Sequence, residues 1–177
     1  PAASLIREGR DIELPSFSAD VHHETELVLL LGKGGRHIAE SDALAHLAGA
    51  GVGLDLTARD TQQALRDKGL PWTISKGFAT AACVSDFHPL HSFPPLDALH
   101  FTLEVNGAQR QAGDTALMIF SVPRIVAFIS ALVELHPGDI IFTGTPHGVA
   151  AIHEGDVLDL SMHHVHARFV VGGREQR

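Results

Sequence analysis

Residues 21–32 have the sequence VHHETELVLLLG, in which Leu27–Leu31 form an unbroken apolar run before a glycine. Such a run, followed by the glycine-rich residues 32–35, predicts a buried strand that ends in a turn. Alternate residues of a strand point to the same face, so we expect Glu24 and Glu26 to project side by side. Two such carboxylates repel each other unless a cation or a shared proton lies between them. The alternative is that the strand begins after both acids, which are then solvated at its entrance.

The composition restricts the classes of partner. The chain has 177 residues, a length that fits one domain spanning residues 1–177, and no apolar run approaches the ~20 residues of a membrane span. The net charge of −8 disfavours nucleic acid, because phosphate binding requires clustered lysine and arginine. The single cysteine, Cys83, rules out an internal disulfide framework and favours a reducing compartment. The clustered His163, His164 and His166 lack a cysteine or carboxylate partner, so we interpret them as surface positions rather than zinc ligands. We therefore predict a cytoplasmic protein that binds neither nucleic acid nor membranes.

Turn residues divide much of the chain into short strands. Asn106-Gly107 between two alternating segments, residues 100–105 and 108–111, is typical of a hairpin with a type I′ turn. Further strands are predicted at residues 52–56, 140–142, 157–162 and 165–171. Residues 1–15 contain a charged turn between two apolar pieces, as in a hairpin. Residues 72–78 are interpreted as a strand or an extended loop.

Three segments have helical patterns. Residues 121–135 are the strongest, with Pro123 near the first turn and an apolar surface too wide for one stripe. Such a helix lies either deep in the core or against a second subunit. The spacing of Thr57 and Asp60 resembles a capping box, which opens a helix that ends near Lys68. Ser41 is a candidate N-cap for a helix in residues 39–49.

Strands outnumber helices, and the elements do not alternate as strand, helix, strand. This order predicts an α+β fold that is mainly β, and it disfavours a doubly wound sheet.

A third carboxylate, Asp55, lies near the end of the strand predicted at residues 52–56. If it lies beside Glu24 and Glu26, the three acids form an all-oxygen site that suits a hard cation such as Mg²⁺. Three carboxylates and one dication leave about one negative charge, so an anionic substrate needs further positive groups. The alternative is that Asp55 only caps its helix, and spacing alone does not bring the three acids together.

Several polar residues could complete such a site. Arg59 and Lys76 are the candidate positive groups, and Gln62 lies three residues after Arg59 on the same helical face. Thr143 and Thr145 flank a glycine where backbone N–H groups and a hydroxyl could hold a carboxylate. The alternative is that these side chains are solvated and that the glycine serves only the turn.

Six motifs follow one another along nearly the whole chain. They are Glu24-x-Glu26 before an apolar strand, Leu54-Asp55-Leu56-Thr57-Ala58-Arg59-Asp60-x-Gln62, Lys68-Gly69-Leu70-Pro71-Trp72 leading to Lys76, Asn106-Gly107 with Arg110-Gln111, Met118-Ile119-Phe120-Ser121, and Pro137-Gly138-Asp139 running into Thr143-Gly144-Thr145-Pro146-x-Gly148-Val149. Taken together and in this order, they resemble the fumarylacetoacetate hydrolase family. His22-His23 before the first acid and the Lys-Gly-Leu-Pro-Trp motif are most similar to the branch of acylpyruvate hydrolases that also decarboxylate oxaloacetate.

The resemblance implies a β-sandwich roll, a homodimer, and a Mg²⁺ or Mn²⁺ ion. The implied metal ligands are Glu24, Glu26 and Asp55. The residues implied to bind and polarise a small 2-oxo acid are Arg59, Gln62, Lys76 and Thr145, with Lys76 as the catalytic residue.

The resemblance also implies a reaction. The expected enzyme hydrolyses a C–C bond of acylpyruvates, such as acetylpyruvate or fumarylpyruvate, to pyruvate and a carboxylic acid, and it also decarboxylates oxaloacetate. Two alternatives remain open. One is an isomerase or decarboxylase of an aromatic-degradation oxo-diacid of the 2-hydroxyhepta-2,4-diene-1,7-dioate type, and the other is a catalytically inactive metal-binding dimer.

Two features depart from the family pattern. Family members open with an additional segment in which a histidine and a glutamate on a lid activate water. Nothing here matches it, so we expect the given chain to begin after that segment. If the molecule itself began at Pro1, oxaloacetate decarboxylation should be retained and acylpyruvate cleavage nearly lost. His147 is the one local candidate for a substitute base. Ala79 stands where many relatives carry an acid, a change that the acylpyruvate hydrolase branch tolerates.

Overall fold

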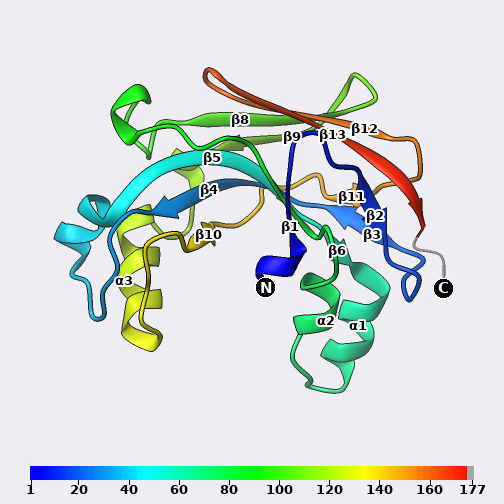
Figure 1. Ribbon diagram of the computed structural model, residues 1–177, viewed down its shortest axis with the longest axis horizontal. Helices are drawn as coiled ribbons and strands as arrows, with labels where there is room; N and C mark the ends of the chain where they lie inside the picture. Colours follow the sequence, from blue (N-terminus) through cyan, green and yellow to red (C-terminus); the bar gives the residue numbers. More distant parts are fainter. Residues whose placement is uncertain (175–177) are drawn as a thin grey trace.

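The structure, a computed structural model, describes residues 1–174 and contains two five-stranded sheets. The strands of the first sheet, in spatial order, are β1 (Leu5–Arg7), β7 (Ala82–Val84), β5 (Leu47–Asp55), β4 (Thr25–Leu31) and β10 (Ile140–Phe142). Those of the second sheet are β2 (Ile12–Leu14), β13 (Val165–Arg174), β12 (Val157–Met162), β8 (His100–Val105) and β9 (Ala108–Asp114). Figure 1 shows the two sheets one above the other, which confirms the expected mainly β sandwich.

The described residues form three α-helices and four short 3₁₀ segments. The α-helices are α1 (Arg59–Asp67), α2 (Thr73–Lys76) and α3 (Val122–Leu132), and the 3₁₀ segments are η1 (Ala2–Ser4), η2 (Glu40–His46), η3 (Leu90–Ser92) and η4 (Thr115–Leu117). In Figure 1, α3 lies at one end of the sheets and α1 and α2 lie at the other. Within residues 1–174, no helix combines the length and the apolarity that crossing a bilayer requires.

The apolar run that follows the two acids lies in β4, an inner strand of the first sheet. Every residue of β4 except Leu30 is buried, including the polar Thr25 and Glu26. The strand pairs in antiparallel fashion with β5 on one side and with β10 on the other. Because both faces of β4 are covered, an unbroken apolar run suits this strand better than an alternating one.

The second sheet follows the alternating pattern of strands with one exposed face. Residues of β12 alternate between partly exposed and buried positions along its whole length. Asn106 and Gly107 join β8 to β9 with φ values of 54° and 75°, and positive φ at both positions is what a type I′ turn requires. The hairpin and the strands predicted at residues 157–162 and 165–171 are therefore confirmed.

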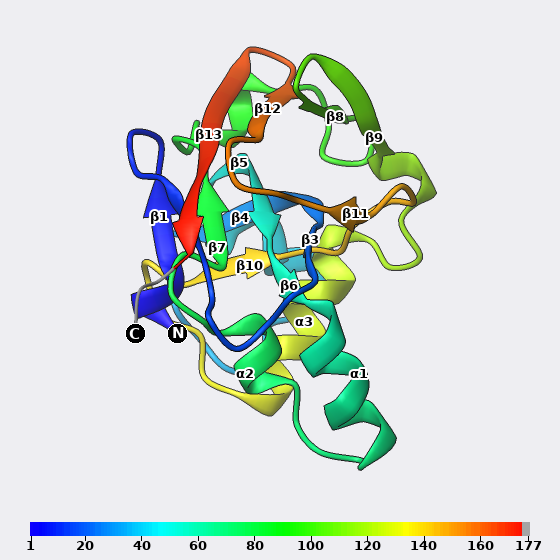
Figure 2. The same cartoon turned by 90° about the vertical axis from the view of Figure 1, so that its right-hand side faces the viewer.

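A small third sheet lies near α1, as Figure 2 shows. Its strands, in spatial order, are β11 (Ala150–Ala151), β3 (Val21–His23) and β6 (Thr57–Ala58). Strand β3 leads directly to β4, and β6 follows β5 after one residue and precedes α1. The carboxyl-terminal end of β5 and the amino-terminal end of β4 therefore meet beside this sheet.

Helix α3 confirms the strongest helical prediction. It begins after Ser121, whose hydroxyl accepts a hydrogen bond from the N–H of Arg124 at 3.4 Å, and it ends three residues earlier than expected. Only Val122, Val126 and Ser130 of the helix are buried. Deep burial in the core of this chain is therefore excluded, and much of the apolar surface faces outward.

Four local predictions are wrong. The apolar pieces of residues 1–15 do not pair with each other, because β1 pairs with β7 and β2 pairs with β13, both in parallel. Residues 72–78, expected to be extended, contain the single turn of α2, in which the Ser75 hydroxyl donates to the Trp72 carbonyl. Thr57 lies in β6 rather than capping α1. Residues 40–46 form a 3₁₀ segment without a side-chain cap.

Candidate metal and substrate site

Three carboxylates meet where β4 begins and β5 ends. One ligand oxygen from each of Glu24, Glu26 and Asp55 lies within 4.8 Å of the other two. Glu26 and Glu24 are buried, and Asp55 is half-buried. Carboxylate oxygens without nitrogen or sulfur are the ligands that hard dications such as Mg²⁺ and Mn²⁺ prefer. The structure thus brings together the three residues that the resemblance assigns to a metal.

The register of two strands explains this convergence. Glu26 lies opposite Gly53 in the antiparallel pair of β4 and β5, and the N–H of Asp55 donates to the carbonyl of Glu24 at 2.8 Å. Residues opposite each other in an antiparallel pair project to the same face of the sheet. Asp55 therefore joins the two glutamates because of a pairing that cannot be deduced from residue spacing.

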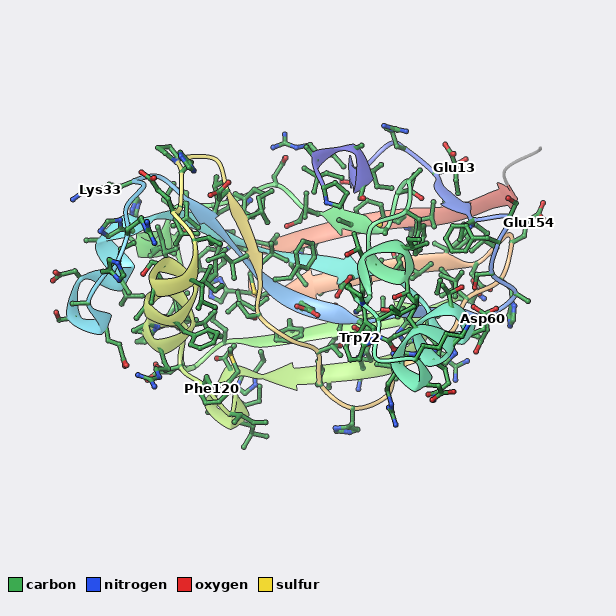
Figure 3. The ribbon with its side chains drawn as sticks, turned by 90° about the horizontal axis from the view of Figure 1, so that it is seen from below. Glu13, Lys33, Asp60, Trp72, Phe120 and Glu154 are labelled. Atoms are coloured by element: carbon green, nitrogen blue, oxygen red, sulfur yellow. The ribbon has the colours of Figure 1, made fainter. Side chains whose placement is uncertain are left out.

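Two helices direct positive charge at the acids. The Nζ atom of Lys76, the last residue of α2, lies 2.6 Å from Oε2 of Glu24 and 2.6 Å from Oδ2 of Asp55. Arg59 opens α1, and its Nη2 atom lies 2.5 Å from Oε1 of Glu24. Its Nη1 atom donates to Oε1 of Gln62 at 2.7 Å. Figure 3 shows labelled residues of the two helical segments, Asp60 and Trp72, on the same side of the molecule.

These contacts shift the pKa values of the groups that make them. Burial alone would raise the pKa of Glu24, but the hydrogen bonds and charges of Lys76 and Arg59 hold it below the ordinary value. Burial alone would lower the pKa of Lys76, but Asp55 and Glu24 raise it. For Asp55, burial outweighs the contact with Lys76, so its pKa is raised.

Glu26 is the carboxylate whose burial is least offset by positive side chains. Burial, followed by repulsion from Asp55 and Glu24, raises its pKa to about 8, although the backbone N–H of Gly144 donates to its Oε2 atom at 2.6 Å. At Glu26, burial and the neighbouring acids thus outweigh the Gly144 hydrogen bond and the positive charge of Lys76. A buried carboxylate with a raised pKa, placed beside two other acids, is suited to binding a dication.

The loop of residues 143–146, which follows β10, lies against the beginning of β4. The Thr143 hydroxyl donates to the carbonyl of Leu27 at 2.8 Å, and the Thr145 hydroxyl donates to the carbonyl of Thr25 at 2.8 Å. Because the Gly144 N–H is bonded to Glu26, these donors already have partners within the chain. The structure therefore places Thr145 beside the acids through a bond to β4.

Sequence reasoning missed a buried polar pair next to the acids. Nδ1 of His23, in β3, lies 2.8 Å from Oε1 of Gln111, in β9, and both residues are 1% exposed. Burial lowers the pKa of His23 although the bond to Gln111 raises it, so the imidazole is held in its neutral form. The motif with Arg110-Gln111 was visible in the sequence, but nothing in it indicated which side chains Gln111 would reach.

A hollow of about 460 Å³ lies beside the loop of residues 143–146 but does not include the acids in its lining. His147, the candidate substitute base, is exposed and lines this hollow. The hollow is walled largely by apolar residues, among them Leu117, Ile119 and Phe120. The histidines at residues 163, 164 and 166 are exposed, as expected for surface positions.

Comparison with known proteins identifies related chains. Residues 1–171 match the family described as "Fumarylacetoacetate (FAA) hydrolase C-terminal". The mitochondrial oxaloacetate tautomerase FAHD1 of Mus musculus is 43% identical over 159 residues, which cover 90% of this chain and 72% of the relative. The mitochondrial oxaloacetate decarboxylase of Dictyostelium discoideum is 40% identical over 159 residues, which cover 89% of this chain and 73% of the relative.

A solved structure extends the likeness to the fold. It is the fumarylpyruvate hydrolase of Pseudomonas aeruginosa in complex with Mn²⁺ and pyruvate, which superposes with a TM-score of 0.91. The two chains are 35% identical, and the match covers 98% of this chain and 77% of that one. Each of the three relatives is named for a small 2-oxo acid as substrate.

Proposed function

This chain belongs to the fumarylacetoacetate hydrolase family, and from that premise we propose that it is a metal-dependent enzyme acting on small 2-oxo acids. The observation that carries the proposal is the position of the Lys76 ammonium, 2.6 Å from both Glu24 and Asp55 within the carboxylate cluster. A bound cation can hold the oxygens of a 2-oxo acid, and an ammonium fixed beside it can stabilise the negative charge that develops during the reaction.

The donor set fits Mg²⁺ or Mn²⁺, and Glu24, Glu26 and Asp55 would hold the ion. Their oxygens are already clustered, since Glu26 and Asp55 lie on paired strands and Glu24 directly precedes β4. When bound, the dication supplies Lewis-acid polarisation of the carboxylate and 2-oxo oxygens of the substrate.

Lys76 is the residue that we assign to the reacting oxygen. A lysine ammonium has three hydrogens, and Glu24 and Asp55 accept two of them. The third hydrogen is available to a substrate oxygen on which an enolate develops. Because the pKa of Lys76 is raised, the ammonium stays protonated at neutral pH. One positioned donor of this kind typically contributes ~10²–10³ in rate.

Arg59 is assigned to binding the substrate carboxylate. Its guanidinium has five N–H donors, and the bonds to Gln62 and Glu24 hold it at the site without using all of them. Gln62 thereby acts by orienting Arg59. Thr145 contributes through the loop whose shape its hydroxyl stabilises.

The proposed reaction is hydrolysis of acylpyruvates, with oxaloacetate as a second substrate. In an acylpyruvate, water adds to the distal carbonyl, the C3–C4 bond breaks, and the products are pyruvate and a carboxylate. In oxaloacetate the C3–C4 bond breaks with loss of CO₂, and the enolate takes a proton from solvent to give pyruvate. Tautomerisation of oxaloacetate, for which the mouse relative is named, breaks a C3–H bond and forms an enolate in the same position.

A comparison of substrates tests the proposal. Acetylpyruvate and oxaloacetate are incubated separately with the protein and Mn²⁺, and pyruvate is measured by coupled reduction to lactate. Free Mn²⁺ itself decarboxylates oxaloacetate, so the rate without protein at the same Mn²⁺ concentration is subtracted. Loss of the enol absorbance of oxaloacetate without pyruvate formation reports tautomerisation. We expect pyruvate from both substrates, and no protein-dependent rate in the presence of EDTA.

The outcomes separate the alternatives. Turnover of oxaloacetate alone would restrict the activity to decarboxylation or tautomerisation. Turnover of neither substrate, with Mn²⁺ binding intact, would leave the 2-hydroxyhepta-2,4-diene-1,7-dioate type of substrate to test before an inactive metal-binding dimer is accepted.

We also propose that the protein is a homodimer. The apolar residues Ile125, Phe128 and Leu132 follow one another along one side of α3, and Phe128 and Leu132 are 61% and 65% exposed. Ile125 lines the same hollow as Ile119, so this helical face continues into the exposed segment after η4. A second copy of the chain is the occupant that the resemblance implies for such a face. A cytoplasmic location stays a prediction, since two relatives are named as mitochondrial.

A further inference from the structure

Gln111 is a buried amide whose four hydrogen-bonding groups all have partners. Its side chain comes from β9, in the second sheet. Oε1 accepts from the N–H of Thr25 at 3.0 Å and from Nδ1 of His23 at 2.8 Å. Nε2 donates to Oγ1 of Thr145 at 2.8 Å and to the carbonyl of Pro146 at 3.0 Å. One side chain of the second sheet therefore connects the beginning of β4 to the loop that follows β10.

The partners of the amide determine its orientation. A backbone N–H only donates and a backbone carbonyl only accepts, so Oε1 must face Thr25 and Nε2 must face Pro146. His23 then has to donate from Nδ1, which selects one tautomer. The Thr145 hydroxyl accepts from Nε2 of Gln111, and its single hydrogen goes to the carbonyl of Thr25. The chain of bonds thus has one direction, from His23 through Gln111 and Thr145 to Thr25.

This direction limits what Thr145 can do for a substrate. Its hydroxyl hydrogen is not available to an anion while the bond to Thr25 persists. The contribution of Thr145 is therefore to hold the main chain of its loop, and that contribution depends on the bond from Gln111. The preceding residue, Gly144, donates its N–H to Glu26.

The residues that follow this loop also lie close against β9. Gly148 has a φ of 101°, and a Cβ atom at this position would lie 2.4 Å from the carbonyl oxygen of Arg110. No larger residue fits there without moving one of the two segments. Close packing at Gly148 and hydrogen bonds from Gln111 thus act on consecutive parts of the segment between β10 and β11.

We propose that Gln111 is a positioning residue for the candidate site. Its amide holds Thr145 and Pro146, so that the Gly144 N–H remains on Glu26 and the loop keeps one shape beside the acids. The effect on turnover rests on the proposed function, but the effect on the loop is a property of the metal-free chain. The competing explanation is that Gln111 only stabilises the packing between the two sheets.

The test compares Gln111→Met with Gln109→Met, an exposed control on the same strand. Methionine has a similar length and lacks both the amide donors and the acceptor. Hydrogen exchange is measured by mass spectrometry on peptides covering residues 143–146 and residues 27–31. Mn²⁺ affinity is measured by calorimetry, and kcat and KM are measured with the substrate that the parent turns over.

For Gln111→Met we expect about tenfold faster exchange in residues 143–146 and unchanged exchange in residues 27–31. We expect kcat/KM to fall by about 10–100-fold, the usual range for residues that support a metal site. The Mn²⁺ affinity should fall less than in Glu26→Gln, because all three acids remain. The Gln109→Met control should match the parent in every measurement.

Two results would overturn the proposal. One is a folded Gln111→Met variant with parental exchange in residues 143–146. The other is a uniform rise of exchange over both peptides with a lower melting temperature, which would make Gln111 a packing residue only. If Gln111→Met does not fold, Gln111→Glu takes its place. This variant keeps the acceptor for Thr25 and His23 but loses both donors. Parental hydrogen exchange in residues 143–146 of Gln111→Glu would also overturn the proposal. A parent without turnover, together with faster loop exchange in the variant, would refute the proposed function and leave the positioning role standing.

Discussion

The N–H of Asp55 donates to the carbonyl of Glu24 at 2.8 Å, and this bond joins the end of β5 to the start of β4. The separation of the two carboxylates is therefore set by a strand pair rather than by flexible loops. Sites built on strands keep their geometry better than sites built on loops. The predictions for Glu26 and Lys76 depend on this rigid arrangement of the acids.

Glu26→Gln should weaken Mn²⁺ binding. The substitution keeps the shape of the side chain but removes a charged oxygen from the cluster, a loss that we expect to reduce affinity by about 10–100-fold. Calorimetry on metal-free protein measures the change. The exposed Glu104→Gln variant is the matched control and should bind Mn²⁺ like the parent. Equal affinity of Glu26→Gln and the parent would show that the ion is held elsewhere.

Lys76→Met should lower kcat by ~10²–10³, because the donor to the developing enolate is lost. Mn²⁺ affinity should be retained or increase, since the ammonium that shares Glu24 and Asp55 with the ion is gone. Lys33→Met is the control, and Figure 3 shows Lys33 far from α1 and α2. Near-normal turnover, or failure of the variant to fold, would contradict the assignment of Lys76 to the substrate.

Phe128→Glu should dissociate the proposed dimer. A charge on this exposed apolar face would be desolvated at a subunit contact, and a charged group buried without a partner is strongly destabilising. Light scattering after size-exclusion chromatography should report about half the parental mass. Leu70→Glu, also at an exposed apolar position, should leave the mass unchanged. An unchanged mass for Phe128→Glu would exclude this face as the contact.

Cys83 should be unreactive in the native protein. Burial raises the pKa of its thiol, so the reactive thiolate does not form near neutral pH, and the side chain is 0% exposed. A chromogenic disulfide reagent at pH 8 should label the chain only after denaturant is added. Because the chain has one cysteine, the entire signal comes from this residue. Rapid labelling without denaturant would show that the edge of the first sheet opens readily.

Asp60 should contribute stability that is lost in acid. Burial alone would raise its pKa, but hydrogen bonds from Ser18, Ala19 and Thr61 together outweigh burial and hold the pKa below its ordinary value of 3.8. A lowered pKa in the folded state means that the stabilisation is present above 3.8 and disappears as the pH falls through the lower folded value.

The measurement is urea unfolding of the parent and Asp60→Asn at pH 7 and at pH 3. We expect the variant to be less stable at pH 7, by at most ~1 kcal/mol because the group is largely exposed, and the difference to shrink at pH 3. Asp97→Asn, at an exposed position, is the control. A difference that does not depend on pH would assign the effect to something other than the carboxylate charge.

Signals confined to a few neighbouring residues predicted structure well. Asn106 and Gly107 adopt the positive φ values of the expected turn, and Pro123 lies in the first turn of α3, as its position indicated. Both depend on interactions that span at most a few residues. The predicted end of α3 was less accurate, because no glycine comes directly after its last helical residue, Leu132, to mark the end.

Features that depend on distant partners were missed. Thr73 and Ile74 are β-branched, which favours extended structure, yet they lie in α2, which brings Lys76 to the acids. Glu24 and Asp55 are brought together by strand register, and the sequence contains no local signal for that register. Gln111 reaches residues more than 80 positions earlier, so its role could not be deduced before the sheets were placed.

The parallel pairing of β2 with β13 has a consequence for biosynthesis. Ile12 lies opposite Val171, so β2, at the edge of the second sheet, cannot pair with β13 until residues 165–174 have been translated. Strands β4 and β5 follow each other along the chain and can pair while later residues are still on the ribosome. We therefore expect Glu24, Glu26 and Asp55 to meet early in the life of the nascent chain. The sheet that carries Gln111 closes last.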